Sequence, residues 1–248
     1  MPFAETPLRD EYAAAVEQLA RRTLDALRDG APVAALPEPP DLEATGFEAT
    51  ASRPLLAAVR VLGADLFAPQ LLAGAEPDGP TAALLARARR TFPAPAAPSP
   101  EAARVVEWQD WAVGRFLART PYGEAAPVPP ALPGPEEVGW QVWSVRMSQL
   151  SGLALPGLDG PVHAGARAHA LDLARGTVRS LLRHDLATAA RLVRWLAWTG
   201  AEGLPPRLEV EPVLDRIRLA GDGSARTGLG LAVARRLLDG SADGRRAA

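Results

Sequence analysis

The sequence predicts an all-α protein, a bundle-like array of many helices joined by Pro-rich connections. Three observations point to this fold class. Apolar residues recur at intervals of three and four along most of the chain, which is the spacing of one helix face. Several of these stretches open on a capping residue followed by Pro, and several end at Gly. The alternation of apolar and charged residues that is typical of a strand is confined to 207–223.

The first helix is expected to begin after Thr6, which can cap it, and to end at Gly30. One apolar face supports it: Tyr12, Val16, Leu19, Leu24 and Leu27. A Pro-rich stretch at 32–41 separates this helix from a second one, which begins near Ser52 and Pro54.

A weaker helical pattern covers 80–91, and Ser99 followed by Pro100 starts another helix that runs to about Arg119. The Pro-rich segment 121–137 follows, either as a boundary between domains or as an ordered strap across a single one. The expected organisation is an N-terminal helical half at 1–120, a connector at 121–137, a C-terminal helical half at 138–240 and a disordered polar tail at 241–248.

In the C-terminal half we expect a helix at 136–152 and a helical tract at 163–199 that is kinked or divided around Gly176 or His184. The segment 207–220 is also compatible with a small β-hairpin. A last helix is expected at roughly 228–239.

Composition excludes several kinds of chemistry. The chain has no Cys, and all 27 of its basic residues are Arg, so disulfides, thiol nucleophiles, lysine Schiff bases and Walker-type phosphate loops are ruled out. The net charge is −2, with Arg alternating with Asp and Glu along the predicted helices. We therefore expect no nucleic-acid partner. No apolar run approaches a membrane span, so we expect no membrane partner and a cytoplasmic protein.

All six tryptophans occur in WxxW pairs, and each pair falls on one face of a predicted helix. The pairs are Trp108 with Trp111, Trp140 with Trp143, and Trp195 with Trp198. The favoured interpretation is an aromatic-rich core where three helices meet. The alternative is a Trp-lined ligand pocket or an exposed partner-binding patch.

Catalytic and metal-binding candidates are scarce. The histidines His163, His169 and His184 lack the i,i+4 spacing of a helical metal site, so no metal is expected. The acids Glu136, Glu137, Asp172 and Asp185 are interpreted as solvated helix charges rather than as an acid–base pair. No cofactor is expected either.

Two short stretches, 184–188 and 226–237, together resemble sensor histidine kinases. HDLAT, from His184 to Thr188, looks like the phosphoacceptor box, and RTGLGLAVARRL, from Arg226, looks like the glycine-rich lid box. The resemblance implies a phosphotransfer role for His184, oriented by Asp185. It also implies a nucleotide-phosphate contact at a helix N-terminus, through Thr227, Gly228 and Gly230.

The family holds magnesium through an asparagine, and this chain contains none, so nucleotide-driven autophosphorylation is not expected. A simpler interpretation is that Thr227 caps a helix and that His184 is an ordinary helix residue. The favoured function is therefore a non-catalytic helical interaction or regulatory protein, whose partner is another protein or a second copy. The alternatives are a degenerate histidine-kinase-like signalling protein and a helical ligand-binding or enzymatic domain with a Trp-lined pocket.

Overall fold

The computed structural model describes residues 5–29, 52–123, 127–221 and 223–247, and every regular element among them is a helix. In chain order, with η for 3-10 helices, these elements are α1 (Glu5–Asp29), α2 (Arg53–Leu62), η1 (Gly63–Phe67), α3 (Ala68–Leu72), α4 (Gly79–Thr91), α5 (Pro100–Leu117), α6 (Pro135–Val138), α7 (Trp140–Gln149), η2 (Ser151–Leu153), α8 (Pro161–Ala168), α9 (Ala170–Leu182), α10 (Leu186–Ala201), α11 (Val210–Ala220) and α12 (Ala225–Ala247). The all-α prediction is confirmed.

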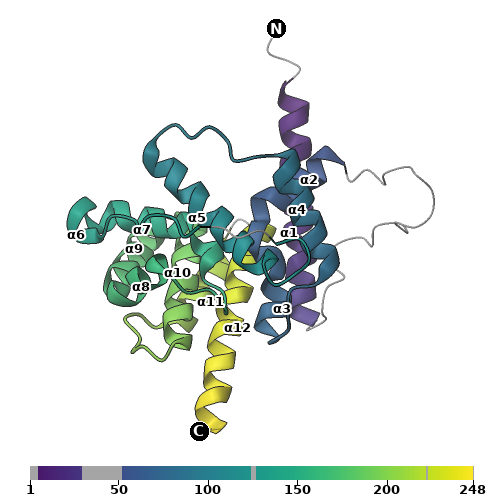
Figure 1. Ribbon diagram of the computed structural model, residues 1–248. Coiled ribbons are helices and arrows are strands. Elements are labelled where there is room, and N and C mark those ends of the chain that lie inside the picture. Colours follow the sequence, from purple (N-terminus) through teal and green to yellow (C-terminus); the bar gives the residue numbers. More distant parts are fainter. Residues whose placement is uncertain (1–4, 30–51, 124–126, 222, 248) are drawn as a thin grey trace.

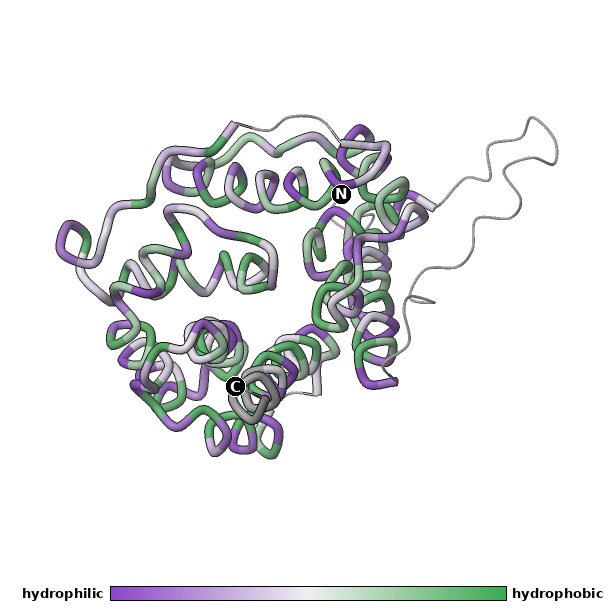
Figure 2. The backbone as a smooth tube through the Cα atoms, turned by 60° about the horizontal axis from the view of Figure 1, so that its bottom comes forward, coloured by the Kyte–Doolittle hydropathy of each residue, from purple (hydrophilic) through white to green (hydrophobic). Residues whose placement is uncertain are grey.

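Figure 1 shows α1 to α4 gathered on one side of the molecule and α6 to α9 on the other, with α10 and α12 between them. The C-terminal helix α12 packs against both α10 and α1. Along the tube in Figure 2, hydrophobic and hydrophilic residues alternate within the turns of the helices, as expected for helices with one buried face.

Helix starts follow the capping rules on which the sequence prediction rests. Ser52 accepts a hydrogen bond from the backbone N–H of Leu55 at 3.4 Å, and Ser99 accepts one from that of Ala102 at 3.2 Å. A proline stands in the first turn of both helices, α2 and α5. The predicted starts near Ser52 and at Ser99 are therefore confirmed.

The boundaries in the C-terminal half differ from the prediction. The helix expected at 136–152 is interrupted at Gly139, whose φ of 79° ends α6 before α7 begins. The tract expected at 163–199 is divided at His169 and again at His184, but not at Gly176, which lies inside α9. A glycine within a helical pattern can mark a close contact instead of a break, and Gly176 does so.

The hairpin considered for 207–220 is wrong, because residues from Val210 onward form α11. Its buried residues Val213, Leu214 and Ile217 have helical spacing, whereas Leu219, which the strand pattern included, is 80% exposed. The disordered tail is also wrong for 241–247, since α12 continues to Ala247. Ala248 lies outside the described residues.

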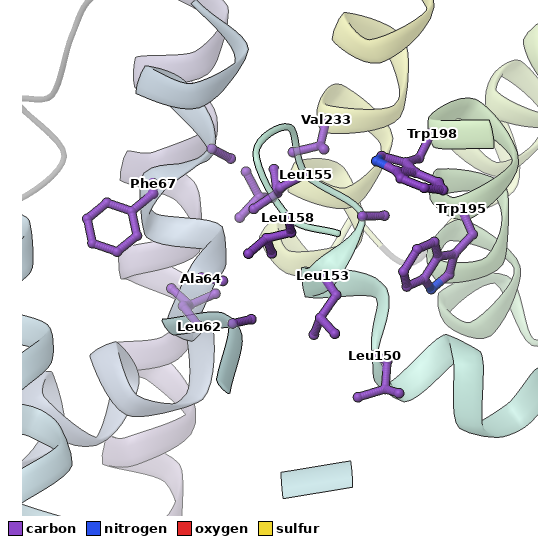
Figure 3. Close-up of a cluster of buried hydrophobic side chains, with 14 of the residues drawn as sticks. Leu62, Ala64, Phe67, Leu150, Leu153, Leu155, Leu158, Trp195, Trp198 and Val233 are labelled. Atoms are coloured by element: carbon purple, nitrogen blue, oxygen red, sulfur yellow. The ribbon is translucent and has the colours of Figure 1, made fainter. Parts of the chain in front are cut away.

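One contiguous apolar core joins helices from both halves of the chain. Figure 3 shows its centre, where Leu153, Leu155 and Leu158 enter between the side of η1 and the tryptophans of α10. Helix α10 is tied to η1 by an ion pair in which Nη1 of Arg194 lies 2.6 Å from Oδ1 of Asp65.

The Pro-rich segment 121–137 contacts the core where it is described. The indole N–H of Trp108 donates to the carbonyl of Pro130 at 3.1 Å, and Leu132 packs against the apolar cluster. These contacts favour the strap over the domain boundary. Residues 124–126 within it, and the Pro-rich stretch 32–41, lie outside the described residues.

The expectation that no apolar run approaches a membrane span is wrong for Arg53–Leu72, which is long and apolar enough to cross a membrane by length and composition. Its most apolar window is 61% buried inside the protein. Arg60 within it makes a two-pronged ion pair with Asp110, at 2.7 and 2.9 Å. The segment therefore contributes to the packed core of the described structure.

Candidate functional site

The tryptophans form core contacts rather than a surface. Five of the six are buried: Trp108, Trp111, Trp143, Trp195 and Trp198. Because they are buried, these five cannot present the partner-binding patch considered from the sequence, and the core interpretation holds for them. Trp140, which is half-buried, is the member of the set that borders a groove.

His163 of α8 joins the tryptophan pair of α5 to that of α10. Its ring centre lies 6.5 Å from that of Trp111, 5.5 Å from Trp195 and 5.0 Å from Trp198. Nε2 of His163 lies 3.0 Å from the carbonyl oxygen of Leu153 and therefore donates the hydrogen bond. Burial lowers the pKa of the imidazole, because the charged form would lose its solvation.

The phosphoacceptor candidate His184 does not lie on a long helix. It occupies the turn between α9 and α10 with a φ of 57°, and its side chain is exposed. Asp185 caps α10, since its carboxylate accepts the backbone N–H of Thr188 at 3.0 Å. The local structure of 184–188 is thus a left-handed turn followed by a capped helix start.

The glycine-rich stretch begins α12, but Thr227 is not the cap. Ser224 accepts the N–H of Thr227 at 3.4 Å, and the carboxylate of Glu17 accepts the N–H of Ala225 at 2.7 Å. Thr227 and Gly230 line a polar cavity beside α10, whereas Gly228 packs toward Leu24 of α1. The candidate set is therefore divided between a cavity and a helix contact.

His169 lies between two of the acids that were interpreted as solvated charges. Its Nε2 is 3.7 Å from Glu136 and its Nδ1 is 4.0 Å from Asp172. Glu137, by contrast, accepts the backbone N–H of Gly134 at 2.9 Å. Among the described residues, no group of three His, Asp or Glu side chains is arranged to hold a metal ion.

An open groove with a volume of about 590 Å³ runs along the outer face of α9. Its apolar floor comprises Trp140, Leu171, Ala174, Val178, Leu182 and Leu208. Leu171 is 49% exposed and Leu182 is 77% exposed, so the floor faces solvent. From Leu171 to Leu182 it extends over about three helical turns, roughly 16 Å.

Four arginines border this floor: Arg175, Arg179, Arg183 and Arg207. Arg175 pairs with Asp172 at 2.9 Å, and the guanidinium of Arg179 lies 5.8 Å from the ring centre of Trp140. Neither Arg183 nor Arg207 forms an ion pair with any described residue. The groove is therefore apolar along its centre and positively charged at its edges.

This groove was not expected from the sequence, although α9 contains a signal for it. The helix buries one face through Leu173, Thr177 and Ser180. A second apolar stripe, which includes Leu171, Val178 and Leu182, remains uncovered. A helix that contacts the core on one side needs only one apolar stripe, so the second stripe of α9 is available for another contact. Only the tertiary arrangement shows which stripe is exposed.

Comparisons with protein-family models, with curated proteins and with solved structures found no match for this chain. The class that fold and site define is thus an all-α protein with an arginine-bordered apolar groove.

Proposed function

We propose that the protein is a non-catalytic interaction protein of the cytoplasm, which binds an acidic amphipathic helix of another protein along α9. The protein would have a regulatory role if the partner's helix were exposed for binding only under some conditions. The observation that supports it is the exposed apolar floor between Leu171 and Leu182, edged by arginines. A cysteine-free chain suits the reducing conditions of the cytoplasm.

The geometry of the groove favours a helical occupant. A floor of about three turns accommodates apolar side chains spaced at i, i+3, i+4 and i+7 on one face of a partner helix. Acidic residues beside that face would pair with Arg183 and Arg207, which form no ion pair with any described residue. Arginine suits this role because its guanidinium binds carboxylates through two parallel hydrogen bonds.

The test uses two designed helical peptides of about four turns, with Leu at the same positions and with either Glu or Lys elsewhere. We expect the acidic peptide to bind in a fluorescence anisotropy titration and the basic one not to bind. Because the edge contacts are exposed ion pairs, the affinity should decrease as salt is raised. Equal binding of the two peptides, or of neither, would contradict the proposal.

Variants then locate the binding site. Leu182→Ser removes an exposed apolar contact, and the double change Arg183→Glu with Arg207→Glu reverses the edge charge. Each should weaken acidic-peptide binding at least about tenfold, roughly 1.4 kcal/mol. The matched control is Leu219→Ser with Arg216→Glu on α11, where both side chains are exposed away from the groove. The control should bind like the wild type.

Two other occupants of the groove are tested by separate measurements. Sedimentation of the wild type and of Leu182→Ser tests the first, because a dimer that this change abolishes would assign the groove to a second copy. Vesicles containing anionic lipid that bind the wild type more tightly than the acidic peptide would assign it to a membrane surface. Either result would overturn the acidic-helix proposal.

A further inference from the structure

A second, smaller cavity of about 200 Å³ lies between the first turns of α10 and α12. Its lining is polar on several sides: Glu17, Asp65, Ser151, Arg191, Arg194, Ser224, Arg226 and Thr227. Apolar contacts with Leu62, Ala187, Ala190 and Leu229 close the remainder. The cavity volume lies below the roughly 300–1,000 Å³ of pockets for drug-sized ligands.

Arginine side chains outnumber carboxylates in the lining of this cavity. Of the two carboxylates, that of Asp65 is paired with Arg194, at 2.6 Å. The other, Glu17, accepts from the N–H of Ala225 at 2.7 Å and from the hydroxyl of Ser224 at 3.1 Å, so both of its oxygens are engaged. Both carboxylates are therefore engaged in contacts within the protein.

Three guanidinium groups retain binding capacity. Arg194 is 1% exposed, and although its Nε donates to the carbonyl of Ala154 at 3.2 Å, its buried Nη2 has no partner among the described residues. Neither Arg191 nor Arg226 forms an ion pair with a described residue. A buried donor without an acceptor is costly, and most buried donors in folded proteins have a partner in the protein or in ordered water.

The two unpaired arginines also act on each other. Burial lowers the pKa of Arg191, and repulsion by Arg226 lowers it further. Asp185 and Asp65 act in the opposite direction, each less strongly than Arg226 does. Like charges disfavour each other's ionised form, and this holds for the two guanidinium groups. An anion placed between them would remove that repulsion.

We propose that this cavity binds a phosphate-type oxyanion, either inorganic phosphate or the phosphoryl group of a small phosphate monoester, between Arg191, Arg194 and Arg226. Guanidinium groups match the geometry of phosphate oxygens, and the hydroxyls of Ser151 and Thr227 supply further donors. The volume admits a phosphoryl group together with a small ester substituent such as glycerol. Two of the three arginines lie on α10, outside the glycine-rich stretch 226–237.

The experiment measures thermal unfolding of the full chain in inorganic phosphate, in glycerol phosphate and in sodium chloride at matched ionic strength. A ligand that binds only the folded protein raises the melting temperature in a saturable manner. We expect such a rise with at least one of the two phosphates and none with chloride. A greater rise with inorganic phosphate identifies the free anion, and a greater rise with glycerol phosphate identifies the ester.

Isothermal titration of variants with the better phosphate tests the location. Arg226→Gln changes an exposed side chain and should weaken binding about tenfold, since one charge-assisted contact is lost. Gly230→Met should abolish binding, because the new side chain would occupy the cavity that Gly230 lines. The change is accommodated locally, since a Cβ at Gly230 meets no atom within 4 Å. The control Arg216→Gln on α11 should bind as the wild type does.

Two outcomes would overturn the site. One is a wild type that phosphate stabilises no more than chloride does. The other is undiminished phosphate affinity in both Arg226→Gln and Gly230→Met. Circular dichroism of each variant establishes that it is folded, so that loss of binding is not mistaken for loss of structure.

Discussion

His163 connects the tryptophan pairs of α5 and α10 while buried and uncharged. Its folded-state pKa lies below the ordinary value because burial penalises the imidazolium. The unfolded chain therefore binds a proton more readily than the folded one. The contribution of the neutral ring to stability is complete above the unfolded-state pKa, near 6.5, and diminishes as the pH falls below it.

The variant His163→Phe should remove this acid sensitivity. Between pH 7.5 and 5.5 the wild type should lose unfolding free energy more steeply than the variant, by at most about 1.4 kcal/mol per pH unit. Urea unfolding at the two pH values measures the difference. The exposed His184→Gln serves as the control and should keep the wild-type slope. Parallel losses in wild type and His163→Phe would contradict the prediction.

Single residues show clearly where sequence reasoning ends. The WxxW spacing predicts that each pair shares a helix face, and the core interpretation holds for five tryptophans. The spacing alone cannot show that Trp140 borders a groove, because the groove also needs Arg179 and Leu208, which come from other segments. Similarly, the functional candidates Arg191 and Arg194 have no sequence pattern that distinguishes them from surface arginines.

Between elements, Gly176 determines how closely α9 approaches α7. A Cβ at this position would lie 2.6 Å from Cβ of Ser144 and 3.1 Å from Cδ1 of Leu192. Alanine favours a helix over glycine by about 1 kcal/mol, but overpacking of this kind costs about 1–3 kcal/mol. We expect Gly176→Ala to lower the unfolding free energy on balance.

Chemical denaturation of Gly176→Ala beside Gly240→Ala measures this effect. Gly240 also lies within a helix, but a Cβ there meets no atom within 4 Å, so this change should raise stability slightly or leave it unchanged. If both variants were stabilised to the same extent, the contact between α7 and α9 would not be limiting. The comparison separates helix propensity from packing.

Helix starts are largely predictable because a cap and its proline are neighbours in sequence, as Ser99 and Pro100 show. Helix ends and the points where a helical tract divides are harder to predict from the sequence. The sequence pointed to Gly176 or His184 as the division of one helical tract, and the chain turns at His184 but not at Gly176. It also turns at Gly139, which was not expected, and both turning residues have a positive φ. Whether a glycine breaks a helix or allows two helices to touch depends on what lies opposite it.

The molecule as a whole should unfold as a single unit. Buried contacts cross from one half of the chain to the other, through the ion pair of Arg194 with Asp65 and the hydrogen bonds of Glu17 at the start of α12. Because one core contains side chains from both halves, neither half is expected to be stable without the other.

Two probes of the same urea titration test this prediction. The buried tryptophans lie on α5, α7 and α10, whereas far-ultraviolet circular dichroism reports on all helices, including α1 to α4. The two signals should change with the same midpoint. An earlier loss of helical signal at unchanged tryptophan fluorescence would mean that α1 to α4 unfold separately.

The all-α class, the capped helix starts and the exclusion of thiol and lysine chemistry all follow from the sequence, since each depends on composition or on residues within one or two helical turns. The order of packing, the exposed stripe of α9 and the meeting of three arginines depend on the tertiary structure. Arg226 and Arg191 lie on different helices, and no local pattern encodes the distance between them. Which side chains are exposed and which charges lie close together are properties of the folded chain. Both proposed sites depend on these properties.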